Sequence, residues 1–222
     1  MTPFMNDQLT AQYCCEANLY PTTGMLSNLG VTFSMASVTN PFGGAPLDAW
    51  RGEYATNRTF DLAVGMSGVK NVYTLMSTRF GYAGDPTDPS TAQASLTFNY
   101  LNGPSVTQYL FGCYNIRDHN PFGYSAGCWG YNAPAPAGSN AAQFASFGNQ
   151  APVVFDMQTW DVSAYASSQL TSITFTDYGP GANSAFLRGV TVDVTSTPEP
   201  ATWALTFTGL LALGGIARRK RA

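Results

Sequence analysis

Short runs of alternating apolar and polar residues, separated by clusters of Gly, Pro, Asn and Asp, constrain this chain more than any other feature. In residues 94–101, Leu96, Phe98 and Tyr100 fall on one face of an extended strand, and the turn sequence Asn102-Gly103-Pro104 ends it. The pattern predicts about eight to ten antiparallel strands. The same two-residue period recurs in residues 72–82, 105–116, 151–162, 170–178 and 188–194.

A single sheet of that size would curl or split, so two packed sheets are the expected arrangement. No amphipathic helix is predicted before residue 201. The sequence therefore predicts an all-β fold, an antiparallel β-sandwich or jelly roll, as one domain over residues 1–196. Residues 120–151 combine low charge with repeated Gly, Ala and Pro. We expect them to form a long loop system across one end of the sandwich.

Charge is sparse and unevenly distributed. Only 10% of the residues are charged, and four of the ten Lys and Arg residues form one cluster, Arg218, Arg219, Lys220 and Arg221. The remaining six lie before residue 198, together with twelve of the thirteen acidic residues. Because such an acidic body repels phosphate backbones, no nucleic-acid partner is expected.

Residues 201–217 carry no charge and are followed directly by the basic cluster. As a helix they would be about 25 Å long, at about 1.5 Å per residue, which is the lower limit for crossing a bilayer. Basic residues resist translocation, so the C-terminus should stay in the cytoplasm and the body should lie outside it. Residues 197–222 are thus predicted to be an anchor segment with one transmembrane helix. The alternative is a buried C-terminal core helix.

Pro198, Glu199 and Pro200, followed by this apolar run and the basic end, resemble the PEP-CTERM sorting signal. The resemblance implies export by a bacterium that makes extracellular polysaccharide, and processing by a membrane-embedded exosortase. Short motifs of the body, among them VYTLMSTRFG, YNIRDH and FDMQTW, resemble a recurring module of PEP-CTERM proteins. The sandwich of that module is similar to galactose-binding-like jelly rolls. The first residues lack the pattern of an export leader, which we expect to precede Met1.

The cysteines fit an oxidising compartment. Cys113 and Cys128 bracket a Gly-rich segment and are expected to form a disulfide. Cys14 and Cys15 are adjacent and would point to opposite faces of a strand, so only one of them can face a given partner. The spacings do not favour a metal site.

Aromatic residues near the predicted loop system are candidates for stacking on sugar rings, and Arg117 and Asp118 for binding sugar hydroxyls. Two alternatives remain: the aromatics cap the end of the core, and the Arg-Asp pair fastens the loop to the sandwich. The aromatic candidates are Tyr114, Phe122, Tyr124, Trp129 and Tyr131.

Catalytic patterns are weak. Ser125 lies in a GxSxG sequence, but no helix can follow it and the single histidine, His119, precedes it. Asp156, paired with Asp161 or Glu53, could form a glycosidase pair, but a solvent-facing position on a strand is the favoured interpretation for Asp156.

Asp85, Asp88 and Ser90 could contribute oxygen ligands to calcium, although two prolines favour a rigid turn. We therefore expect no catalytic residue, no metal and no cofactor. The sequence predicts a non-catalytic, anchored cell-surface or extracellular-matrix protein, either structural or sugar-binding, whose partners are an exosortase-type enzyme, the membrane and extracellular polysaccharide.

Overall fold

The computed structural model describes residues 2–3, 24–35, 50–51, 58–79, 81–118, 128, 133–147, 153–179 and 184–195. Within these residues the chain forms strands and two short 3-10 helices, η4 (Pro89–Thr91) and η5 (Ser163–Tyr165). The strands are β1 (Thr2–Pro3), β2 (Gly24–Asn28), β3 (Val31–Met35), β4 (Trp50–Arg51), β5 (Thr59–Met66), β6 (Val69–Arg79), β7 (Ala94–Tyr100), β8 (Val106–Leu110), β9 (Ala141–Phe147), β10 (Val153–Asp161), β11 (Leu170–Asp177) and β12 (Ser184–Val194).

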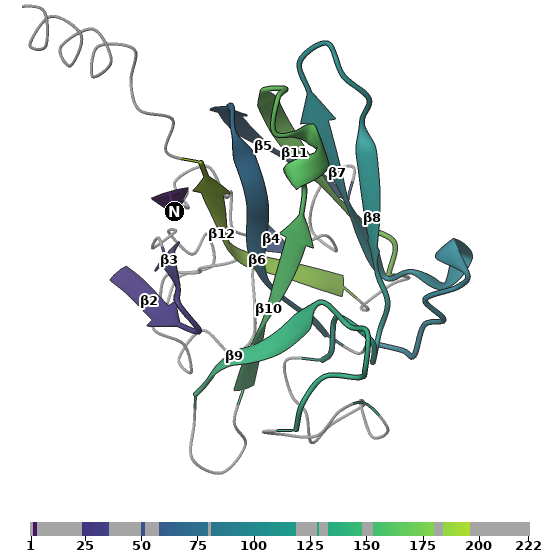
Figure 1. Cartoon of the computed structure of the whole chain (residues 1–222). Helices are drawn as coiled ribbons and strands as arrows, with labels where there is room; N and C mark the ends of the chain where they lie inside the picture. Colours follow the sequence, from purple (N-terminus) through teal and green to yellow (C-terminus); the bar gives the residue numbers. More distant parts are fainter. Residues whose placement is uncertain are drawn as a thin grey trace, which may run out of the picture.

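The strands form two main sheets and a hairpin (Figure 1). A six-stranded sheet has the order β1-β12-β6-β10-β9, with β4 also paired to β12. A four-stranded sheet has the order β5-β11-β7-β8, and β2 pairs with β3. Neighbouring strands in all three units pair antiparallel. The prediction of an all-β, antiparallel fold is confirmed.

The two main sheets share one hydrophobic core. Leu96 and Phe98 of β7 pack with Met76 of β6 and Leu187 of β12, and all four side chains are buried. The alternation predicted for residues 94–101 is confirmed, since Tyr100 belongs to the same core. This sandwich-like packing follows from the period of two, which directs every second side chain of each strand between the sheets.

A second, smaller core covers the outer face of the six-stranded sheet. Phe33 of the β2–β3 hairpin meets Phe144 of β9 edge to face, with ring centroids 5.0 Å apart, and both pack near Leu75 and Phe155. Gly189 of β12 makes this approach possible, because a Cβ there would lie 3.0 Å from the Phe33 ring. Strand β6 is consequently buried on both faces. In Figure 1 the β2–β3 hairpin lies on the left, β7 and β8 of the four-stranded sheet lie on the right, and β6 and β10 of the six-stranded sheet lie between them.

Two sequence expectations about the elements are wrong. The predicted strand at residues 105–116 ends at Leu110, because Gly112 packs against the Tyr82 carbonyl where a Cβ would have no room, and Cys113 has a φ of 64°. The predicted loop system at residues 120–151 contains β9. Its Ala-rich sequence gave little strand signal, and pairing with β10 supplies the missing stabilisation.

None of the helices among the described residues is both long and apolar enough to cross a membrane. The predicted transmembrane segment, residues 201–217, the Pro198–Pro200 motif and the basic cluster lie outside the described residues.

Candidate functional site

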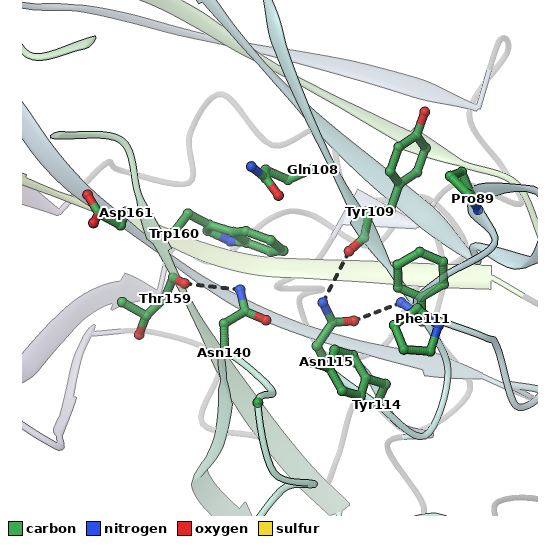
Figure 2. A pocket seen from close by; sticks show the side chains of 12 residues that line it. Pro89, Gln108, Tyr109, Phe111, Tyr114, Asn115, Asn140, Thr159, Trp160 and Asp161 are labelled. Carbon is green, nitrogen blue, oxygen red and sulfur yellow. Dashed lines mark hydrogen bonds between the residues drawn. The ribbon is translucent and has the colours of Figure 1, made fainter. Parts of the chain in front are cut away.

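A cleft of about 510 Å³ opens where the two sheets part. Strand β8 is the edge of the four-stranded sheet, and β10 with the edge strand β9 faces it from the six-stranded sheet. The volume lies within the range of small-molecule sites. Figure 2 shows the lining side chains, which come from β8, β10, the turn after β8, and the segments before β9 and around η4. They are Pro86, Pro89, Gln108, Tyr109, Phe111, Tyr114, Asn115, Gly138, Asn140, Thr159, Trp160 and Asp161.

Trp160 forms the β10 side of the cleft. Trp160 pairs in register with Val72, a core residue, so its ring lies on the inner face of the sheet. The indole Nε1–H donates to Thr74 Oγ1 at 2.9 Å. Only 5% of the residue is exposed, so one part of the ring packs in the core and the rest faces the cleft. The hydrogen bond and the packing fix the plane of this ring.

Gln108 forms part of the opposite side. It pairs in register with Leu96, so its side chain also lies on the inner face, between the core residues Val106 and Leu110. Gln108 is nevertheless exposed, because β8 is an edge strand and the sheets diverge there. A polar residue at an inner position of an amphipathic strand thus marks where the core ends.

Asn115 holds the aromatic end of the cleft. Its Oδ1 accepts the Phe111 N–H at 2.7 Å, and its Nδ2 donates to the Tyr109 carbonyl at 3.1 Å (Figure 2). These two bonds close the turn after β8 and place the rings of Tyr109 and Phe111 6.2 Å apart. Tyr114 follows in the same turn.

Two further polar groups line the β10 side. Asn140 donates its Nδ2–H to the Thr159 carbonyl at 3.0 Å, and the Asn140 Oδ1 takes no part in this hydrogen bond. Asp161 is exposed and accepts the Ser163 N–H at 2.9 Å. Hydrogen bonds from the Ser163 side chain and backbone hold the pKa of the Asp161 carboxyl below its usual range. Asp161 pairs in register with Asn71, so its side chain lies on the face of β10 opposite Trp160.

A buried ion pair anchors the turn from behind. Arg117 contacts Asp156 of β10 through two hydrogen bonds, Nε to Oδ2 at 2.8 Å and Nη2 to Oδ1 at 2.9 Å. Its Nη2 also donates to Gln143 Oε1 at 2.6 Å. Burial raises the pKa of the Asp156 carboxyl to about 7, and the charge and hydrogen bonds of Arg117 oppose that rise. Gln158 of β10 adds a hydrogen bond from Nε2 to the Asn115 carbonyl at 3.1 Å.

This geometry bears on two sequence interpretations, and the one for Asp156 is wrong. Asp156 was expected on a solvent-facing position but is fully buried, because the turn after β8 covers its face of β10. Arg117 and Asp118 were candidates for sugar binding, but only 1% and 3% of them are exposed. The alternative interpretation, in which Arg117 fastens the segment after β8 to the sheet, agrees with these contacts.

Cys113 and Cys128 form a disulfide, the pairing that the sequence predicts. Their Cα atoms are 4.4 Å apart. Since Cys113 precedes Tyr114, the bond ties the aromatic end of the cleft to a residue farther along the chain.

The residues considered as possible calcium ligands are engaged within their own turn. Asp85 Oδ1 accepts hydrogen bonds from the backbone and hydroxyl of Thr87, and Asp88 Oδ1 accepts them from the backbone and hydroxyl of Ser90. This agrees with the rigid-turn alternative. The residues that the structure describes contain no group of three or more His, Cys, Asp or Glu suited to a metal.

Several candidates lie outside the described residues, and the predictions about them stay predictions: Cys14, Cys15, Glu53, His119, Phe122, Tyr124, Ser125, Trp129 and Tyr131. Of the predicted aromatic group, Tyr114 lines the cleft. The sequence analysis missed Gln108, Tyr109, Phe111, Asn140 and Trp160 as lining residues. The inner-face position of Gln108 was the available signal, because a lone amide between apolar neighbours breaks the alternation.

No family model matches this chain, and neither a curated protein nor a solved structure shows significant similarity to it.

Proposed function

We propose that this chain is an exported, non-catalytic cell-surface or extracellular-matrix protein whose cleft binds carbohydrate. The observation that carries the proposal is the convergence of aromatic rings and amide side chains on one open cleft between two sheets. Sugar rings have an apolar face that stacks on aromatic side chains and hydroxyls that bind amides, so this lining matches their chemistry.

Different side chains of the cleft would bind the apolar face and the hydroxyl groups of a sugar. The partly exposed ring of Tyr114 offers a stacking surface. Gln108 and Asn140 offer donors and acceptors for hydroxyl groups. Because the hydrogen bonds of Asn115 fix the turn in advance, little conformational entropy is lost when a sugar binds.

The proposed route to the cell surface rests on the C-terminal sequence. Residues 201–217 would hold the chain in the membrane, and an exosortase-type enzyme would process it near Pro198–Pro200. The Cys113–Cys128 disulfide supports export, because such bonds persist in oxidising compartments.

A glycan array with the full chain tests the binding proposal. We expect bound glycans, and about tenfold weaker binding by Tyr114→Ala, the loss expected for one stacked ring. Tyr178→Ala is the matched control, because Tyr178 is 45% exposed and does not line the cleft. An array without a bound glycan would favour a purely structural matrix role. Equal losses of glycan binding in Tyr114→Ala and Tyr178→Ala would contradict the proposal that the cleft is the binding site.

Cell fractionation tests the proposed route. A tag within the body should follow the membrane fraction in the full chain and should leave it when residues 197–222 are deleted. Soluble cytoplasmic protein in both cases would contradict export.

A further inference from the structure

Two residues of the cleft lining, Tyr109 of β8 and Asp161 of β10, direct their side chains away from the cleft. The residue before each of them, Gln108 and Trp160, lies on the inner face of its sheet. Because successive side chains of a strand point to opposite faces, the side chains of Tyr109 and Asp161 lie on the outer faces. In Figure 2 the Asp161 carboxylate points away from the other lining side chains. These two residues therefore line the cleft with their backbone.

The backbone of Tyr109 faces the open edge of its sheet. Strand β8 is an edge strand and pairs only with β7. The Tyr109 carbonyl accepts a hydrogen bond from Asn115 Nδ2 at 3.1 Å, so it points away from β7. The N–H and the C=O of one strand residue point to the same side, so the Tyr109 N–H also points to this edge. Among the described residues this N–H donates to no acceptor.

The backbone of Asp161 is open in the same way. The Thr159 N–H donates to the Asn140 carbonyl at 2.9 Å, and the Thr159 carbonyl accepts from Asn140 Nδ2 at 3.0 Å, so both groups point toward β9. Asp161 is two residues farther along β10 and points to the same side. Strand β9 begins at Ala141, and the register leaves Asp161 without a partner on that strand. Within the described part of the chain, the Asp161 N–H and C=O form no hydrogen bond.

The two asparagines mark where strand pairing ends on the two sides of the cleft. The side-chain amide of Asn115 bonds to the edge of β8, and that of Asn140 bonds to the edge of β10, each in place of a neighbouring strand. The backbone groups beyond them, the Tyr109 N–H and the Asp161 N–H and C=O, face a concave site that also contains aromatic rings. A ligand can replace water at such groups when it supplies the matching donors and acceptors.

An uncharged sugar matches these groups, because each hydroxyl can both donate and accept a hydrogen bond. In β-linked glucose the ring hydroxyls are equatorial, so they point outward around the ring and leave both of its faces apolar. Backbone groups on two opposing sides, with the rings of Trp160 and Tyr114 in the same cleft, suit this arrangement. In mannose one hydroxyl is axial and occupies a face that would otherwise stack.

We propose that the cleft recognises glycans of β-linked glucose through the backbone of two strand edges, with the Tyr109 N–H and the Asp161 N–H and C=O binding the equatorial hydroxyls. This proposal rests on the sugar-binding function proposed above.

Calorimetric titration of the full chain with the hexamers of β-1,4-linked glucose and β-1,4-linked mannose tests this. We expect the glucose hexamer to bind about fivefold tighter than the mannose hexamer. Tyr109→Pro removes the N–H and should weaken binding of the glucose hexamer about fivefold, the value of one hydrogen bond. Tyr109→Ala keeps the N–H and should bind about fivefold tighter than Tyr109→Pro.

Thr107→Pro is the matched control. It also places proline at an outward-pointing position of the edge strand, which an edge tolerates, but Thr107 does not line the cleft. Its affinity should equal that of the parent chain. A measurement without any variant is the backbone amide spectrum of the labelled chain, in which the glucose hexamer should shift the signals of Tyr109 and Asp161.

The outcomes separate this inference from the proposed function. Equal affinities of Tyr109→Pro and Thr107→Pro would overturn the role of the Tyr109 N–H, and unmoved amide signals of Tyr109 and Asp161 would overturn the edge contacts. Both results leave sugar binding in place. Equal affinity for the two hexamers would overturn the preference for glucose. No heat with either hexamer would overturn the whole inference, and a glycan array without hits would then also contradict the proposed function.

Discussion

Asp156 and Asp161 lie on the same strand, β10, and differ in almost every physical respect. Asp156 is fully buried and pairs with Arg117, whereas Asp161 is exposed. Alternation places Asp156 and Trp160 on the inner face of β10 and Asp161 on the other face. The segment after β8 covers the first half of the inner face, at Asp156 and Gln158, and leaves the second half, at Trp160, facing the cleft. The buried half stabilises the fold, and the open half is available for a ligand.

The largest expected effect on stability comes from the buried half of β10, which contains Asp156. Asp156→Asn should lower the free energy of unfolding by about 3–5 kcal/mol, because it removes the carboxylate charge that pairs with the buried Arg117 guanidinium. Urea unfolding followed by circular dichroism measures this. Asp161→Asn is the control on the same strand and should change stability by less than about 0.5 kcal/mol. Equal effects of the two variants would refute the contrast.

The Cys113–Cys128 disulfide is expected to have the next largest effect on stability. The double variant Cys113→Ser with Cys128→Ser should lose about 3 kcal/mol of stability, the value expected for a closed loop of about 15 residues. It should also weaken glycan binding, because Cys113 precedes Tyr114 in the turn. Thermal unfolding and the array together measure this. A variant as stable as the parent chain would show that the covalent tie does not constrain the turn.

Asn115 connects the two halves, because its side chain closes the turn and its carbonyl accepts from Gln158. Asn115→Ala should cost about 2 kcal/mol, since it leaves the Phe111 N–H and the Tyr109 carbonyl without their side-chain partners. Hydrogen exchange at the Phe111 amide should accelerate relative to amides of β7. Unchanged exchange at Phe111 would contradict the role of this side chain.

The smallest effect on stability is expected in the open half. Gln108→Ala should leave the free energy of unfolding within about 0.5 kcal/mol of the parent value, because Gln108 is exposed on an edge strand. Its affinity for a bound glycan should fall about fivefold through loss of a hydrogen bond. Parallel unfolding and binding titrations separate the two effects. A large loss of stability would place Gln108 in the core instead.

The difference between the covered and open parts of β10 also explains which features of the fold could be predicted from sequence. Alternation identified β7 because its apolar residues meet a single core, and the fold class followed from several such strands. The burial of Asp156 could not be inferred, since alternation assigns a residue to a face but does not show that a distant segment covers that face. Residues 141–147 were interpreted as loop because Ala and Ser carry little strand preference, and only pairing with β10 makes them a strand.

The candidate site was predicted only in part for the same reason. Sequence proximity gathered aromatics around residue 124, and Tyr114 is the one that lies in the described cleft. Trp160 and Asn140 reach it through sheet topology, which brings β10 and the segment before β9 opposite β8. Phe111 and Tyr114 belong to a segment that was interpreted as one continuous strand, although the turn after Leu110 is what positions their rings.

The most direct test of the central claim is to locate a bound sugar by NMR. Titration of the full, isotope-labelled chain with a glycan identified on the array should shift the side-chain amide signals of Gln108 and Asn140 and the indole N–H of Trp160. The Nε2–H signal of Gln158, behind the turn, should stay in place because that amide is buried. Shifts confined to residues away from the cleft, with Gln108 and Asn140 unmoved, would contradict the account.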